Sequence, residues 1–257
     1  HLADYEPTDI PSILKRAKKA GVGAIISAGT NIQSSSRCID LSLQYPSIFA
    51  GIGIHPSDIT NPITDLEINK LYDLAKSTEK LVVMSEIGLD FQTHSPDRKL
   101  QYDAFRQQIR IARELKKPII FHSRNAHSET LRLLKEERGY EVGGVMHYFQ
   151  ADISTAKSAI DLGFHISLAK PLLRLDELQK TTQYLPLESL VIETDSYPQP
   201  FKSKRTLWTE PRHLKEIIEK LSELKNENVQ NLEKILEKNI FNVLGTKNSE
   251  VVKKFIL

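Results

Sequence analysis

The chain has 257 residues, enough for one large domain that buries its own apolar core. Its 40% hydrophobic and 26% charged residues are typical of an ordinary soluble globular protein, and a net charge of +2 does not by itself predict nucleic-acid binding. The single cysteine, Cys38, excludes an internal disulfide and favours a reducing compartment. No long linker or abrupt shift of composition divides the chain, so we expect one domain over residues 1–257. No apolar run reaches the ~18 residues of a membrane span, and we expect the protein in the cytoplasm, with a nucleus or organelle as alternatives.

Helical and apolar segments alternate from the beginning of the chain. The first predicted element is a helix over residues 8–20, residues 99–117 form another with Phe105, Ile109 and Ala112 on one face, and residues 229–245 form the last. Short β-branched runs predict strands at 23–30, 49–55, 81–88, 118–123, 143–149, 164–169 and 189–195. Strands that are apolar throughout and separated by helices indicate a parallel sheet covered by helices.

The spacing of these units favours a closed barrel over an open sheet. No glycine-rich phosphate motif follows the first strand, where a dinucleotide-binding sheet would have one. Seven evenly spaced units in this length fit an α/β fold of the (β/α)8 TIM barrel type, which takes ~250 residues. The count is one strand short, and we expect the missing strand one to precede His1. His1 then lies after that strand, next to the last strand of the barrel and to Asp195.

Histidines and carboxylates lie at the C-terminal ends of several predicted strands, where such barrels assemble their active sites. These residues are His55, Glu86, Asp90, His122, His147 and Asp195. Nitrogen and oxygen ligands from separate strands suit Zn²⁺, Mn²⁺ or Mg²⁺. A lone histidine is more often structural, and we interpret the following as structural: His94, His127, His165 and His213. The shared face of the barrel instead favours metal binding by four residues: Glu86, His122, His147 and Asp195.

Four stretches carry a resemblance to a known family. In order and spacing, "SEIGLDF", "QYDAFRQQIRIARELKKPIIFHSR", "VMHYF" and "VIETDS" resemble the TatD family of metal-dependent deoxyribonucleases, which belong to the amidohydrolase-like metal-dependent hydrolases. The resemblance covers nearly the whole chain, with "GIGIHPSD" early and "TEPRHL" late. Members begin with an Asp-x-His-x-His-Leu motif, and "HLADYE" is similar to the tail of that motif. By this match, His1 corresponds to the second histidine.

The resemblance implies two divalent metal ions, Zn²⁺, Mg²⁺ or Mn²⁺, with Glu86 bridging them. His122 and His147 would hold one ion together with Glu86. His1 and Asp195 would hold the other, together with the histidine expected before residue 1. Two such ions activate water and stabilise both the attacking and the leaving oxygen of a phosphoryl displacement.

The resemblance also implies a substrate, single-stranded DNA cleaved from its 3′ end, with Asp195 as the proton acceptor. His55, in the Gly-x-His-Pro motif, would contact substrate phosphate or an additional ion. Arg124 is a second candidate phosphate contact, and an ordinary surface position is its alternative. In the loop after the last strand, Tyr197 and Trp208 are candidates for stacking on a base, with packing inside the loop as the alternative.

Two other functions remain open at this stage. The same metal site suits an ester or amide hydrolase, such as a D-aminoacyl-tRNA deacylase. A catalytically impaired binding protein gains support from the missing first strand. The chain also departs from the usual family pattern, with "HYFQA" for His-x-Phe-Ser/Thr-Gly and "DSYPQP" for Asp-Ser-Pro-Tyr-Leu. These departures remove no expected ligand, but they alter two loops that shape the substrate pocket.

Overall fold

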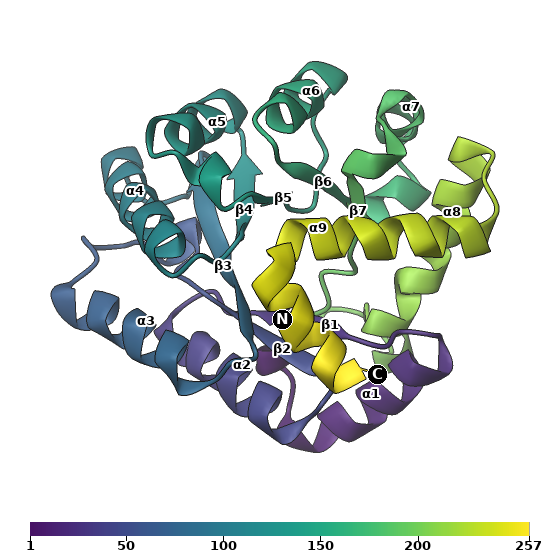
Figure 1. Cartoon of the computed structure of the whole chain (residues 1–257), viewed down its shortest axis with the longest axis horizontal. Helices are drawn as coiled ribbons and strands as arrows, with labels where there is room; N and C mark the ends of the chain where they lie inside the picture. Colours follow the sequence, from purple (N-terminus) through teal and green to yellow (C-terminus); the bar gives the residue numbers. More distant parts are fainter. Residues whose placement is uncertain (257) are drawn as a thin grey trace.

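In the computed structural model, which describes residues 1–256, a curled parallel sheet is surrounded by helices (Figure 1). Its seven strands are β1 (Ile25–Ala28), β2 (Ile48–Ile52), β3 (Leu81–Asp90), β4 (Ile119–Arg124), β5 (Gly144–Met146), β6 (His165–Leu168) and β7 (Leu190–Ile192). Each strand pairs in parallel with the next one along the chain. The seven predicted strands and the TIM-type α/β fold are therefore confirmed.

Nine α-helices of the described residues cover the sheet. They are α1 (Ile10–Lys19), α2 (Ile32–Gln44), α3 (Asp65–Ser77), α4 (Arg98–Glu114), α5 (His127–Glu136), α6 (Ile153–Asp161), α7 (Asp176–Tyr184), α8 (Leu214–Lys225) and α9 (Val229–Ile256). The three helices predicted above match α1, α4 and α9, although α9 continues past its bend at Gly245. None of the helices formed by residues 1–256 is long and apolar enough to cross a membrane.

Helix α9 closes the end of the sheet where the strands begin, and it crosses the front of the view in Figure 1. The amide of Asn239 donates to the carbonyl of Leu190, the first residue of β7, at 2.8 Å. The ammonium of Lys117 bridges the carbonyl of Leu81, where β3 begins, and Asn248 of α9, at 2.6 and 2.7 Å. A functional site is therefore left to the opposite end of the sheet, where the strands finish.

Residues 1–5 pack beside β1 at the edge of the sheet. The backbone N–H of Leu2 donates to Ser27 Oγ at 3.2 Å, and the Tyr5 hydroxyl donates to the Thr209 carbonyl at 2.8 Å. Leu2 and Tyr5 are buried, so this short segment is fixed both to β1, the first strand, and to the loop after β7, the last strand. The further strand expected before His1 stays a prediction.

Candidate metal centre

Strand β3 carries Glu86 into the centre of the site. All ten residues of this strand are buried, and Glu86 is 3% exposed. Between Met84 and Ile87, β3 advances three residues while β4 advances two, so that Glu86 lies in a β-bulge. Bulges redirect side chains and are frequent beside active sites. The backbone N–H of Glu86 donates to the carbonyl of Gly29, just beyond β1, at 2.7 Å, which fixes the bulge.

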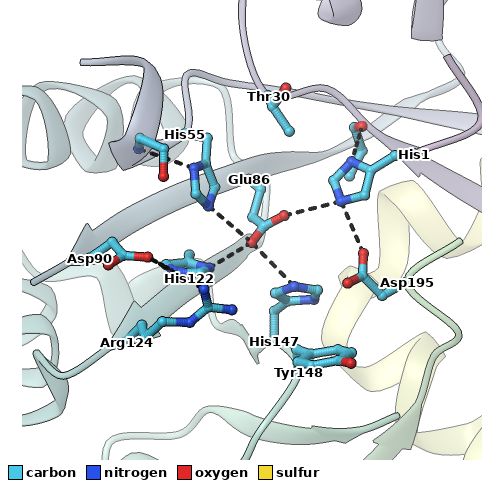
Figure 2. A network of polar contacts seen from close by, with 12 residues as sticks. His1, Thr30, His55, Glu86, Asp90, His122, Arg124, His147, Tyr148 and Asp195 are labelled. Carbon is cyan, nitrogen blue, oxygen red and sulfur yellow. Dashed lines mark hydrogen bonds and ion pairs between the residues drawn. The ribbon is translucent and has the colours of Figure 1, made fainter. Parts of the chain in front are cut away.

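Four histidines surround the Glu86 carboxylate (Figure 2). The nitrogen–oxygen distances to this carboxylate are 3.0 Å for His122, 3.2 Å for His147, 3.4 Å for His1 and 3.6 Å for His55. They come from β4, the residue after β5, the beginning of the chain and the loop after β2. The structure thus brings together side chains from separate strand ends, as the sequence predicted.

An acceptor oxygen lies behind three of the four rings. These oxygens are Ala28 O behind His1 at 3.1 Å, Asp90 Oδ2 behind His122 at 3.0 Å, and Glu193 Oε1 behind His147 at 2.8 Å. A carbonyl or carboxylate oxygen only accepts, so the ring nitrogen facing it must carry the hydrogen. In the neutral imidazole, the other nitrogen then directs a lone pair at Glu86. Histidines that bind metals in proteins are held in this way.

His55 has the opposite arrangement. Its Nδ1 accepts a hydrogen bond from the backbone N–H of Ser57 at 3.1 Å, so the hydrogen of the neutral ring lies on Nε2. Ligand atoms of His55, Glu86 and His122 lie within 4.8 Å of one another, a separation that suits a metal ion. A protonated Nε2 nevertheless has no lone pair for a metal. His55 is therefore placed to donate a hydrogen bond into the site.

Asp195 completes the site from the loop after β7. Its Oδ1 lies 3.1 Å from His1 Nε2, across the gap between the first and last strands. No hydrogen bond reaches this buried oxygen from the described residues. When the His1 ring is neutral, the Oδ1 of Asp195, the Nε2 of His1 and the Oε2 of Glu86 face one another as electron-pair donors. Such a set requires a cation, and its nitrogen and oxygen atoms fit a divalent metal ion.

The charges of the site perturb the pKa values of its members. Burial by itself lowers the pKa of His147, but Glu193 and Glu86 outweigh it and raise that pKa to about 10. Burial likewise opposes ionisation of Glu86, yet the histidines around it hold its pKa well below the usual value. The pKa of His1 is raised well above its usual value, because Asp195 and Glu86 outweigh burial. Without a metal, protons on the histidines balance the carboxylates, so a metal ion must displace protons when it binds.

A cavity of about 580 Å³ opens above these residues. Arg124 lines it, with Nη1 3.3 Å from Gln92 Oε1, so the structure places this predicted residue at the cavity wall. His127 also lines the cavity, with Nδ1 2.8 Å from Ser123 Oγ, although its sequence context indicated a structural role.

Two aromatic candidates take different positions. Tyr197 lines the cavity. Trp208 packs against Tyr5, with ring centroids 6.1 Å apart, and lies outside the residues that line the cavity. The packing alternative therefore describes Trp208. His165, at the beginning of β6, is also outside the cavity lining, and burial lowers its pKa.

Sequence reasoning did not identify Glu193. This carboxylate accepts hydrogen bonds from His147 at 2.8 Å, from the backbone of Tyr148 at 3.0 Å and from Ser167 Oγ at 2.5 Å. A signal was present, because Glu193 precedes Asp195 by two residues and alternate residues of an extended chain share a face.

Comparison with known proteins agrees with this geometry. The family model for TatD related DNases matches residues 1–245. The chain belongs to the TatD family. The uncharacterized metal-dependent hydrolase YabD of Bacillus subtilis (strain 168) is 31% identical over 92% of this chain and 93% of its own length. The 3'-5' ssDNA/RNA exonuclease TatD of Citrobacter koseri is 30% identical over 92% of this chain and 93% of its own length.

A solved structure supports the same membership. The crystal structure of YJJV, a TatD homolog from Escherichia coli K12, matches with a TM-score of 0.84 and 27% identity, covering 93% of this chain and 94% of that one. As a TatD-family member, this chain is a metal-dependent hydrolase. Its cluster of histidines and carboxylates contains nitrogen and oxygen atoms of the kind that bind divalent metal ions.

Proposed function

We propose that this TatD-family chain hydrolyses phosphodiester bonds of single-stranded DNA from the 3′ end, with two divalent metal ions. The observation that carries the proposal is that the carboxylates of Glu86 and Asp195 and three histidine rings meet at one place. Acceptor oxygens fix the rings of these histidines, which are His1, His122 and His147. The printed name of the Citrobacter koseri relative, an ssDNA/RNA exonuclease, supports the substrate.

The carboxylate of Glu86 faces two sets of ligands. Its Oε1 lies toward His122 and His147, and its Oε2 lies toward His1, beside Asp195. Each set would hold one ion, and Glu86 belongs to both sets. Zn²⁺, Mg²⁺ or Mn²⁺ bound there would supply Lewis acidity toward the phosphoryl group and would lower the pKa of water.

Three side chains complete the proposed chemistry. Asp195 accepts the proton of the attacking water, because it is an ionised carboxylate despite its burial and has one oxygen free of hydrogen bonds. The pKa of Asp195 is lowered because His1 and His147 outweigh the effect of burial. His55 donates its Nε2 hydrogen to a phosphate oxygen, which agrees with the hydrogen bond that Ser57 makes to the other nitrogen. Arg124 binds a neighbouring phosphate from the cavity wall.

The test compares nucleic acid and aminoacyl substrates on one enzyme preparation. Single-stranded DNA labelled at the 5′ or the 3′ end, the same strand in a duplex, RNA, and a D-aminoacyl-tRNA are each incubated with Mg²⁺, Mn²⁺ or Zn²⁺. We expect stepwise shortening of the single strand from its 3′ end and loss of activity with a chelator. Hydrolysis of only the D-aminoacyl-tRNA would instead select the deacylase alternative.

A pair of matched variants separates the metal centre from general effects of charge. Glu86→Gln keeps the size of the side chain and removes the bridging charge, so we expect at least a 10³-fold loss of kcat/KM. Glu177→Gln makes the same change at an 87% exposed side chain and should retain full activity. Activity that survives in the Glu86→Gln enzyme, or in the presence of chelator, contradicts the two-metal mechanism.

A further inference from the structure

Tyr148 is held in the cavity by a strained backbone. Its φ of 48° lies in the left-handed region, which large side chains rarely adopt. The backbone N–H of Tyr148 donates to Glu193 Oε1 at 3.0 Å, and this bond fixes the conformation. Strain of this kind concentrates at functional sites, because the surrounding structure must stabilise it. Here it directs an aromatic ring into the cavity rather than into the core.

The ring lies directly beside a predicted metal ligand. The centroids of Tyr148 and His147 are 5.7 Å apart, and their planes are inclined by 35°. Figure 2 shows Tyr148 next to His147 on the side of Asp195, whereas Arg124 lies on the side of Asp90. Tyr197 lines the same cavity from the loop that carries Asp195, and 37% of it is exposed.

Beyond the metal centre, the lining of the cavity therefore contains two chemically different groups of side chains. Gln92, Arg124 and Asn125 present donors and amides, with Arg124 Nη1 3.3 Å from Gln92 Oε1, and Tyr148 and Tyr197 present aromatic rings. A nucleotide has the same division, with an anionic phosphate at one end and a flat aromatic base at the other. Hydrogen-bond donors suit the phosphate, and aromatic rings suit the base through stacking that tolerates any base identity.

We propose that Tyr148 and Tyr197 form a stacking subsite for one unpaired nucleobase of the nucleotide beside the scissile phosphate. The proposal rests on the nuclease function above and extends it to the recognition of the base. A base that is paired and stacked inside a duplex cannot lie against Tyr148, because its faces already contact neighbouring bases. The subsite would therefore give a preference for single strands without reading sequence.

The kinetic test compares an ordinary DNA strand with one whose 3′-terminal nucleotide carries a base-free sugar analogue. For the unmodified enzyme, we expect KM to rise about tenfold on the base-free strand. Tyr148→Leu should raise KM about tenfold on the ordinary strand and leave the base-free strand unchanged, while Tyr148→Phe, which keeps the ring, should behave as the unmodified enzyme. Both variants keep the backbone bond to Glu193. Tyr184→Leu is the control, since Tyr184 is 75% exposed and outside the cavity lining.

Two kinetic results would overturn the proposal. One is equal KM for both strands with the unmodified enzyme. The other is an equal loss on both strands in Tyr148→Leu, which would mean that the ring supports the metal centre and not the base. Metal affinity is measured in each variant alongside the kinetics, and we expect it to be unchanged.

A binding measurement separates this proposal from the nuclease function. A strand with 2-aminopurine at its 3′ end loses fluorescence when that base stacks on an aromatic ring. Quenching by the unmodified and Tyr148→Phe proteins but not by Tyr148→Leu supports the subsite, even if no DNA is cleaved and the nuclease proposal fails. Cleavage of DNA without quenching leaves the nuclease proposal intact and overturns the subsite.

Discussion

Replacing Glu193 tests the hydrogen bond behind a predicted metal ligand. This carboxylate orients His147 through a 2.8 Å contact and accepts two further hydrogen bonds, from the backbone of Tyr148 and from Ser167. Removing such a partner typically lowers metal affinity 10-fold to 100-fold, or about 1.4 to 2.7 kcal/mol. Glu193→Ala leaves both N–H donors without a partner, so we expect a loss near 100-fold. Glu193→Gln keeps an amide oxygen for both donors, while Ser167 can rotate to accept from the amide nitrogen.

The glutamine variant loses only the charge. Charge-assisted hydrogen bonds are roughly twice as strong as neutral ones, a difference of about 1 kcal/mol, so Glu193→Gln should bind metal about fivefold more weakly. Loss of the charge also lowers the pKa of His147, which reduces competition by protons and partly offsets the effect as the pH falls. The comparison is therefore made at several pH values between 7 and 10, by competition for Zn²⁺ with a fluorescent chelator, so that the contribution of proton competition at His147 is measured. Glu188→Gln, at an exposed glutamate, is the control. Unchanged affinity in Glu193→Ala would refute the reasoning.

Three further predictions follow from single contacts. His55→Ala should change metal affinity by no more than about twofold but lower kcat/KM at least tenfold, because the Nε2 of His55 carries a hydrogen and not a lone pair. Metal titration and kinetics on one preparation check this, and loss of a metal ion from the variant would contradict it. The metal-free protein should melt at a lower temperature as the pH rises from 7 to 10. The pKa of His147 is about 10 when folded and ~6.5 when unfolded, so its contribution is complete below pH 6.5 and is lost through pH 10. Thermal melts test this, and a melting temperature that rises with pH would count against it. Gly144→Ala should lower the free energy of unfolding by at least ~2 kcal/mol, because a Cβ there would lie 1.9 Å from the Ile119 carbonyl oxygen. A Cβ at Gly143 would meet no atom within 4 Å, so Gly143→Ala should lower the free energy of unfolding by only about 1 kcal/mol. Denaturant titrations measure both values. Equal costs at the two glycines would show that backbone conformation, not the close contact, determines the loss.

Local pattern was sufficient for the strands and for the residue types at their ends. Apolar runs such as residues 81–88 are long and β-branched, so they indicate buried parallel strands without knowledge of their neighbours. Parallel order then requires that all C-terminal ends meet at one end of the sheet. For this reason His122 and His147 could be placed beside Glu86 from sequence, and His1 could be placed near Asp195.

Hydrogen bonds between distant residues were not visible in the pattern. The strand pattern places both His55 and His122 at strand ends. The structure distinguishes the two rings by the group behind each, which is the Ser57 N–H for His55 and the Asp90 carboxylate for His122. Glu193 shows the same limit. Its spacing from Asp195 is a local signal for its position, but its hydrogen bonds reach across 26 to 46 positions of the chain, so local periodicity does not identify its partners.

The sequence by itself determined the barrel-type sheet and the set of candidate nitrogen and oxygen ligands, because hydrophobic periodicity and strand direction are properties of short segments. Only the tertiary structure decided which group lies behind each histidine ring, how the bulge of β3 turns Glu86 toward the other candidate ligands, and that Tyr148 faces the cavity. These features depend on backbone and side-chain groups that meet only after the sheet curls, and the chemistry of the site follows from them.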